Sequence, residues 1–334
     1  MKTNKLLKSS MSVALALTIS SITAQAWPTN SNIAKADFGD TAATQQTKTE
    51  LNEIINRRIT NMKIISFNVE AGGVGKTAIC VNAATLLASK GFRVLVFGTD
   101  RSMNLTNRMI GYYARKNGLD ADEVLANIKP ENTVEMLFQR LPFSPIKITD
   151  NIDLIAETRT LYDLRDIKSF SLLHWWWDVE KYLTEEYDYI LIDTHNDQSE
   201  FTKSVYAISD IITAIIDKTE KTYKRKVAEI KELLNIVKNE NRSRTETFVT
   251  ARVVVLANMI DKSVLGKQMR NKMNKLVREH PNDFVGCIEY RESFPKSDAL
   301  YMPLWEYRKY DKGDWSLDKF YRDTERLLLK LADM

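Results

Sequence analysis

The strongest chemical signal in the sequence is a glycine-rich stretch that ends in lysine and threonine, Asn-Val-Glu-Ala-Gly-Gly-Val-Gly-Lys-Thr at residues 68–77. It follows an apolar run typical of a strand, at 64–67, and precedes residues with the apolar spacing of a helix. Glycines let backbone N–H groups close around an anion, and the start of the helix adds partial positive charge. The pattern predicts a triphosphate site formed by Gly72, Gly73, Val74, Gly75, Lys76, Thr77 and Ala78.

A magnesium ion is the expected companion of the triphosphate. Thr77 has its hydroxyl where a phosphate-binding loop ligates Mg²⁺, which bridges the terminal phosphates. A second signal, Tyr-Asp-Tyr-Ile-Leu-Ile-Asp-Thr at 187–194, is an apolar strand that ends in an acid. Such a carboxylate typically holds Mg²⁺ through a water molecule. We therefore expect Thr77 and Asp193 to form the metal site.

These residues need strands whose carboxyl ends lie at one edge of a sheet, where open α/β folds bind their ligands. From Met62 onwards, apolar runs of strand length alternate with segments of helical spacing, which is the pattern of a parallel sheet covered by helices. Residues 107–150 are expected to be helical and carry no chemical motif. The expected strands lie at 64–67, 92–97, 152–156, 187–193, 210–216, 252–256 and 284–288, and the clearest helices at 78–88 and 169–186.

Three consecutive tryptophans, residues 175–177, lie in the second of these helices. A helix turns by about 100° per residue, so at least one of three neighbours must face solvent. Core packing is the expected role of the group, and a surface for a partner protein is the alternative.

The two motifs resemble those of the ParA/MinD family of partition and positioning ATPases, in its ParA/Soj-like branch, whose members carry a deviant Walker A loop. Residues 72–77 and 187–194 match the family pattern most closely, and weaker matches extend the resemblance over about residues 62 to 332. The resemblance implies an α/β fold of the P-loop NTPase class, with a doubly wound and mostly parallel sheet. It also implies ATP and Mg²⁺ as cofactors, and ATP hydrolysis.

Further site residues follow from the resemblance. Asp100 matches the carboxylate that orients the attacking water, and with Lys76 it forms the expected catalytic pair. Asn258 matches the position whose amide reads adenine in relatives. Pro295 lies in a segment that resembles the loop closing over the base.

The sequence also departs from the family pattern. A signature lysine that reaches across the dimer to the partner's nucleotide is replaced by Ala71, after Glu70. This change predicts slow hydrolysis with nucleotide binding retained. Where the family has Asp-x-Asp, this chain has Gly-x-Asp at residues 98–100. Where the family has a Pro-Pro pair, this chain has His195-Asn196. We expect His195 to be a loop residue rather than a catalytic base.

Two predicted helices carry clusters of basic residues, between Lys218 and Lys226 and between Lys262 and Arg278. Such clusters are usually solvated helix faces. Partition ATPases of the family, however, bind DNA non-specifically through basic residues, which requires only phosphate contacts. The expected function is therefore plasmid or chromosome partition by an ATP-dependent homodimer. It would bind DNA through these helices and work with a centromere-binding, ParB-like adaptor that stimulates hydrolysis.

Two other functions stay open. One is a nucleotide-dependent switch or scaffold with little turnover, which Ala71 favours. The other is a MinD-like membrane-associated ATPase whose C-terminal amphipathic helix binds lipid, which apolar and basic residues between Lys319 and Leu331 would support. We expect that helix to close the core instead, so no membrane partner is expected.

The first 61 residues point to a different compartment from the rest of the chain. Three lysines among the first eight residues precede an uncharged run from Met11 to Ile22, and a signal-peptidase site would allow cleavage after Ala26. An ATPase, however, needs cytoplasmic ATP. We expect residues 1–61 to be a signal-like segment and linker outside the fold, and residues 62–334 to be a cytoplasmic, nucleoid-associated ATPase domain. An exported or membrane-tethered form is the alternative.

The overall composition adds little to these expectations. The chain has 334 residues, 44% hydrophobic and 28% charged, which suits one large α/β domain. Cys80 and Cys287 have no metal-type spacing and indicate a reduced protein without disulfides. The net charge of +4 comes mostly from residues 1–61, so overall charge identifies no partner.

Overall fold

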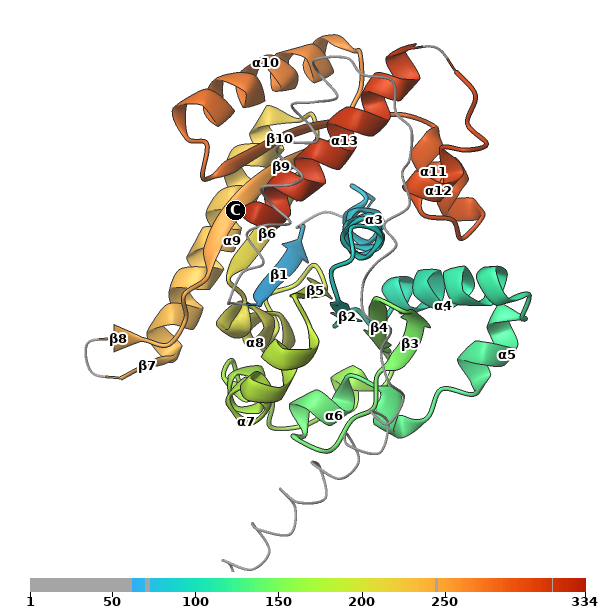
Figure 1. Cartoon of the computed structure of the whole chain (residues 1–334). Coiled ribbons are helices and arrows are strands. Elements are labelled where there is room, and N and C mark those ends of the chain that lie inside the picture. The colour runs from blue at the N-terminus through green and yellow to red at the C-terminus, as the bar shows by residue number, and fades with distance from the viewer. Residues whose placement is uncertain (1–61, 70–72, 244–245, 314) are drawn as a thin grey trace, which may run out of the picture. The chain divides into compact units, whose positions relative to one another are not determined.

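A central sheet positions the predicted site residues (Figure 1). The computed structural model describes residues 62–69, 73–243, 246–313 and 315–334. The expectations for residues 1–61, including cleavage after Ala26, and those for Glu70, Ala71 and Gly72 therefore lie outside the described residues. The strands of the main sheet are β1 (Lys63–Asn68), β2 (Val94–Gly98), β3 (Ile146–Thr149), β4 (Ile152–Ile155), β5 (Tyr189–Asp193), β6 (Ile211–Ile216), β9 (Arg252–Ile260) and β10 (Phe284–Glu289).

The strand order is β10-β9-β6-β1-β5-β2-β4-β3, and every neighbouring pair is parallel except β3 with β4. The predicted doubly wound, mostly parallel α/β sheet is thereby confirmed. The strand β3 was not predicted, because residues 107–150 were expected to be helical. A separate antiparallel ribbon joins β7 (Arg242–Ser243) to β8 (Glu246–Thr247).

Helices cover both faces of the sheet. One face is packed by α3 (Lys76–Ser89), α4 (Asn104–Asn117) and α13 (Trp315–Asp333), and the other by α7 (Ser171–Glu186), α8 (Glu200–Ile208), α9 (Glu220–Glu240) and α10 (Val264–Glu279). The shorter helices are α5 (Ala121–Ala126), α6 (Glu135–Phe138), α11 (Ser293–Ala299) and α12 (Leu304–Tyr307).

The C-terminal helix α13 closes the core. Phe320, Leu328 and Leu331 are buried, and the helix packs on β10 and α3. The expectation of a core helix is therefore confirmed, because the apolar residues that a lipid-binding helix would need already face the protein. None of the helices in the described part of the chain is long and apolar enough to cross a membrane.

The three tryptophans of α7 have different environments. Trp175 is 1% exposed and packs edge-on against Phe97 of β2, with ring centroids 6.3 Å apart. Trp176 packs partly buried against the same core, whereas Trp177 is 50% exposed and contacts Phe248. Packing is thus the role of the first two residues.

We expect Trp175→Ala to lower the free energy of unfolding by about 3–5 kcal/mol, because it leaves a cavity in a well-packed core. The matched variant Trp177→Ala removes a half-exposed ring that contacts His174 and Phe248, and it should cost less than about 1.5 kcal/mol. Urea unfolding of both variants checks this difference. Equal losses would contradict the burial described here.

Candidate nucleotide and metal site

The loop between β1 and α3 is built to receive an anion. Gly73 and Gly75 have φ angles of 85° and 81°, in the left-handed region that favours glycine. Gly75 is the N-cap of α3 and supplies no side-chain cap, and the first turn of the helix carries no acid. The first N–H groups of α3 therefore have no partner within the helix, and its positive end attracts negative charge.

Lys76 forms a buried ion pair at the start of α3. Its ammonium group, 6% exposed, lies 2.6 Å from Oδ1 of Asp193 and also donates to the carbonyl oxygen of Thr194. Asp193 is fully buried at the end of β5, the strand beside β1. The pair joins the two predicted motifs, which are more than a hundred residues apart in the sequence.

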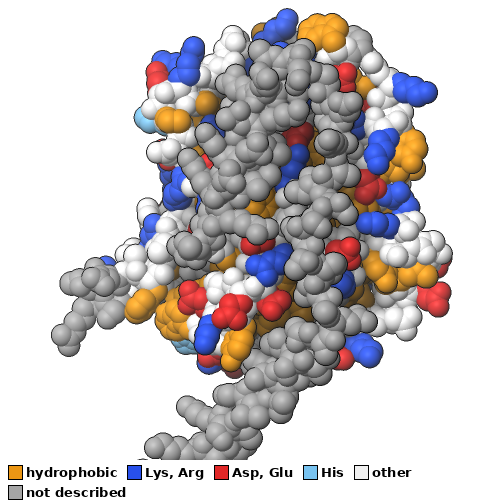
Figure 2. All heavy atoms as spheres, viewed as in Figure 1, with side chains coloured by type: hydrophobic (Ala, Val, Ile, Leu, Met, Phe, Trp, Pro, Cys, Tyr) orange, Lys and Arg blue, Asp and Glu red, His pale blue; other side chains and the backbone are white. Residues whose placement is uncertain are grey.

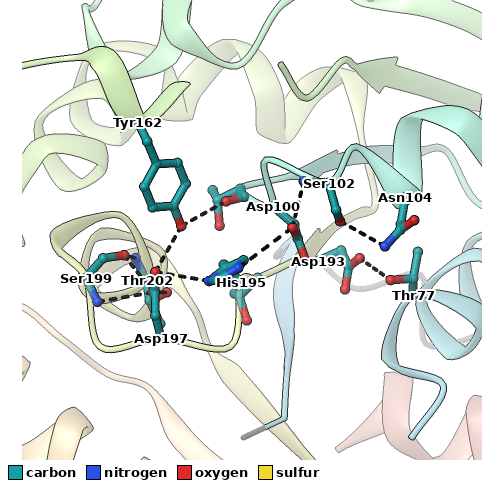
Figure 3. Close-up of polar contacts among 12 residues, drawn as sticks. Thr77, Asp100, Ser102, Asn104, Tyr162, Asp193, His195, Asp197, Ser199 and Thr202 are labelled. Atoms are coloured by element: carbon teal, nitrogen blue, oxygen red, sulfur yellow. Dashed lines mark hydrogen bonds and ion pairs between the residues drawn. The ribbon is translucent and has the colours of Figure 1, made fainter. Parts of the chain in front are cut away.

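Thr77 completes this cluster. Its hydroxyl donates to Oδ2 of Asp193 over 2.6 Å (Figure 3). A threonine hydroxyl and a carboxylate are oxygen ligands of the kind that Mg²⁺ prefers. The structure thus brings together the two residues predicted to hold the metal, and their donor set fits the ion.

Asp100 lies near this cluster, in the loop that follows β2. It is 9% exposed, and its Oδ1 accepts a hydrogen bond of 2.9 Å from the N–H of Ser102. Nε2 of His195 is 4.0 Å from the same oxygen. The carboxylate is therefore held in a fixed position at the carboxyl edge of the sheet.

His195 belongs to a polar network that the sequence did not predict (Figure 3). Its Nδ1 lies 3.0 Å from Oδ2 of Asp197, and this contact raises the pKa of His195. The same oxygen of Asp197 accepts a hydrogen bond from the Tyr162 hydroxyl over 3.1 Å. Asp197 also accepts from Ser199 and Thr202; burial opposes its charge, but these hydrogen bonds and His195 lower its pKa.

The sequence reasoning also missed Glu157, which lies two residues beyond the end of β4. This side chain is 1% exposed, and burial, followed by the charge of Asp193, raises its pKa to about 8. One signal was available: an acid directly after a predicted strand lies at the ligand-binding edge of a parallel sheet. Glu157 therefore adds a third buried carboxyl group to the region of Asp100 and Asp193.

Of the residues predicted to contact the base, Asn258 lies on β9 and Pro295 lies in α11. Asn258, at 4% exposed, donates from Nδ2 to the carbonyl oxygen of Val74 over 2.8 Å, so it braces the glycine loop. Pro295 is exposed in α11. Ala78 lines a small cavity together with Phe294 and Ser297, two residues that lie close to Pro295 in the sequence. Pro295 itself does not line this cavity.

Comparison with known proteins agrees with this geometry. Residues 62–248, more than half of the chain, match the AAA domain family. An uncharacterized protein of Methanocaldococcus jannaschii is 26% identical over 251 residues, which cover 74% of this chain and 92% of the relative.

Two solved structures are similar in fold. A plasmid partition protein of Borrelia burgdorferi bound to AMPPNP has a TM-score of 0.61 and 19% identity, with 82% of this chain and 99% of that chain covered. The MinC:MinD cell division complex of Aquifex aeolicus gives a TM-score of 0.56 and 16% identity, with 81% and 96% covered. The chain therefore belongs to the AAA domain family and has the P-loop fold of the ParA/MinD-type partition ATPases.

Proposed function

We propose that the chain is a dimerising ATPase that binds ATP with Mg²⁺ and partitions plasmid or chromosomal DNA with a centromere-binding adaptor. The observation that carries the proposal is the cluster of Lys76, Thr77 and Asp193 at the uncapped start of α3. It combines a cation, an anion-binding helix end and oxygen ligands for a metal. The plasmid partition protein of similar fold, which is bound to an ATP analogue, supports the same use of the site.

Each residue has a distinct task in this proposal. The N–H groups of the loop and of α3 bind the phosphates, and Lys76 exchanges its contact with Asp193 for one with the triphosphate. Thr77 and Asp193 hold Mg²⁺, which neutralises charge on the phosphates. Asp100 orients the attacking water, for which it needs only an acceptor oxygen within hydrogen-bond reach. Asn258 and Pro295 are proposed to contact the base.

The DNA surface is proposed on α9 and α10, which touch through Tyr223 and Lys272. The Lys272 ammonium sits 4.6 Å from the ring centroid of Tyr223, and Lys218 pairs with Asp261. Figure 2 shows Lys and Arg side chains both at the margin of the visible face and near its centre. Among the described side chains of the two predicted basic clusters, the exposed basic residues are Lys224, Arg225, Lys262, Lys267, Lys275 and Arg278.

The prediction that Lys226 belongs to the DNA surface is wrong. Lys226 is 4% exposed, so its ammonium group cannot reach a DNA phosphate. The reason is its place on α9: it lies one turn before Ile230 and two turns before Leu233, which are both buried, on the face of the helix that packs inward. Lys226 is therefore left out of the proposed DNA surface.

Ala71 favours a second candidate, a nucleotide-dependent switch with little turnover, because the trans charge of the signature lysine is missing. Adaptor-stimulated ATP hydrolysis would distinguish the ATPase from the switch. In both proposals residues 62–334 act in the cytoplasm, on the nucleoid, and residues 1–61 stay outside the fold.

We expect Lys76→Ala to abolish ATP binding or weaken it severely, because the ammonium group of Lys76 is the cation that the described structure holds at the start of α3. Asp100→Ala is the matched variant and should retain ATP affinity while losing turnover, because its role is limited to the water. Calorimetric titration with ATP and Mg²⁺, together with phosphate release, measures both effects. Wild-type affinity in a folded Lys76→Ala variant would refute the assignment of the loop.

A second prediction concerns DNA. Reversing the exposed Lys267 and Lys275 to Glu should weaken binding equally on two unrelated duplexes, and should lower the salt dependence by about one unit of slope for each phosphate that the variant no longer binds. Fluorescence anisotropy between 50 and 200 mM salt, roughly the range over which phosphate binding matters, is the measurement.

Reversal of Lys129 and Lys309, which are exposed in other parts of the structure, provides the control with the same change in net charge. If both double variants lose affinity equally, overall charge explains the binding and α10 is not the DNA site.

A further inference from the structure

One oxygen of the buried Glu157 has a clear structural role. Oε2 accepts a hydrogen bond of 3.0 Å from the N–H of Thr106, and the N–H of Glu157 donates to the Thr106 hydroxyl over 2.7 Å. Thr106 lies in the first turn of α4, whose N-cap residue Met103 makes no side-chain cap within the described residues. Glu157 thus caps α4 from outside the helix.

The other oxygen, Oε1, is buried and has no hydrogen-bond partner in the described part of the chain. It occupies the space above Gly98, so a Cβ atom on this glycine would clash with Oε1. The three atoms closest to that Cβ all belong to Glu157, and the backbone of Gly98 does not have a positive φ. Among the described residues, Glu157 is therefore the obstacle to a side chain at position 98.

Gly98 lies beside the metal site. Gly98 pairs in register with Asp193, while β4 flanks β2 on the other side. The Glu157 carboxyl group thus reaches from the end of β4 over β2, and it interacts electrostatically with Asp193, Lys76 and Asp100. The family pattern that this sequence resembles has an Asp where Gly98 stands, except in its iron-protein branch, which also has Gly.

We propose that Glu157 is a positioning residue of the metal site, whose free oxygen holds a water of the Mg²⁺ hydration shell in place of an acid at position 98. Mg²⁺ usually keeps several waters in proteins, and these waters need acceptors. A buried oxygen without a partner is costly unless it gains one, and the capping of α4 leaves Oε1 unexplained. This inference rests on the proposed function, since it requires Mg²⁺ and nucleotide at the loop.

The experiment measures the Mg²⁺ concentration required for half-maximal binding of a fluorescent ATP analogue. Glu157→Gln keeps one oxygen to accept from the N–H of Thr106, and it replaces the other oxygen, the proposed acceptor for the water, with an NH2 group that can only donate. We expect it to raise the required Mg²⁺ concentration by about 10–100-fold, the usual effect of losing such a supporting group. Binding in the presence of EDTA should stay unchanged.

Glu135→Gln is the matched control. Glu135 is also buried, at 8% exposed, and also has an oxygen without a described partner, but it lies in α6 and not in the site. Its Mg²⁺ requirement should equal that of the wild type.

A relocated carboxylate keeps the inference testable even if Glu157→Gln does not fold. Gly98→Asp alone should lower the melting temperature because of the clash with Glu157, whereas Gly98→Asp combined with Glu157→Ala should fold and restore a Mg²⁺ requirement near that of the wild type. Glu157→Ala alone should not.

The possible failures are distinct. A wild-type chain that binds no nucleotide at any Mg²⁺ concentration would overturn the proposed function, and the inference with it. A wild type that binds with Mg²⁺, beside a folded Glu157→Gln variant with the same requirement, would overturn the inference alone. A folded variant with both Gly98→Asp and Glu157→Ala whose Mg²⁺ requirement is not restored would also overturn the inference alone.

Discussion

The buried ion pair between Lys76 and Asp193 is the interaction on which the site depends. It joins the start of α3 to the end of β5, and it lies in a region where removal of charges from water is expensive. Loss of one partner from such a pair typically costs about 3–5 kcal/mol, because the other charge stays buried and unpaired. The site can therefore release Lys76 only when another charged group compensates Asp193. A triphosphate that arrives with a divalent cation satisfies both partners at once.

The same constraint explains the other acids at this edge of the sheet. Asp193 ends β5, and Asp100 and Glu157 each lie two residues beyond the ends of β2 and β4, so the parallel topology places three carboxyl groups at one edge of the sheet. Burial and the charge of Asp193 keep the pKa of Glu157 near 8, so an empty site carries less negative charge than its composition suggests. The pKa of Asp197, in contrast, is lowered, because His195 and two hydroxyl groups stabilise its charge.

Local patterns predicted most of the fold and the centre of the site. The glycine loop and the strand at 187–194 each combine several residues in a fixed order, so both motifs and seven strands of the main sheet could be read from the sequence. Contacts between residues far apart in the sequence could not be read in this way. The cap that Glu157 gives to α4 joins residues 51 positions apart, and the burial of Lys226 depends on how α9 packs. The antiparallel edge strand β3 was missed although its four residues, Ile-Lys-Ile-Thr, alternate between apolar and polar, because they were included in a region expected to be helical.

The most direct test of the account is hydrogen–deuterium exchange of the unmodified chain with and without ATP and Mg²⁺. We expect added protection in three segments that are far apart in sequence, near residues 73–90, 98–106 and 193–202, because these carry the loop, Asp100 with the start of α4, and Asp193 with its following network. Protection that requires both ATP and Mg²⁺ would agree with a metal site at Thr77 and Asp193. Nucleotide binding that leaves all three segments unchanged, or that protects only other parts of the chain, would contradict it.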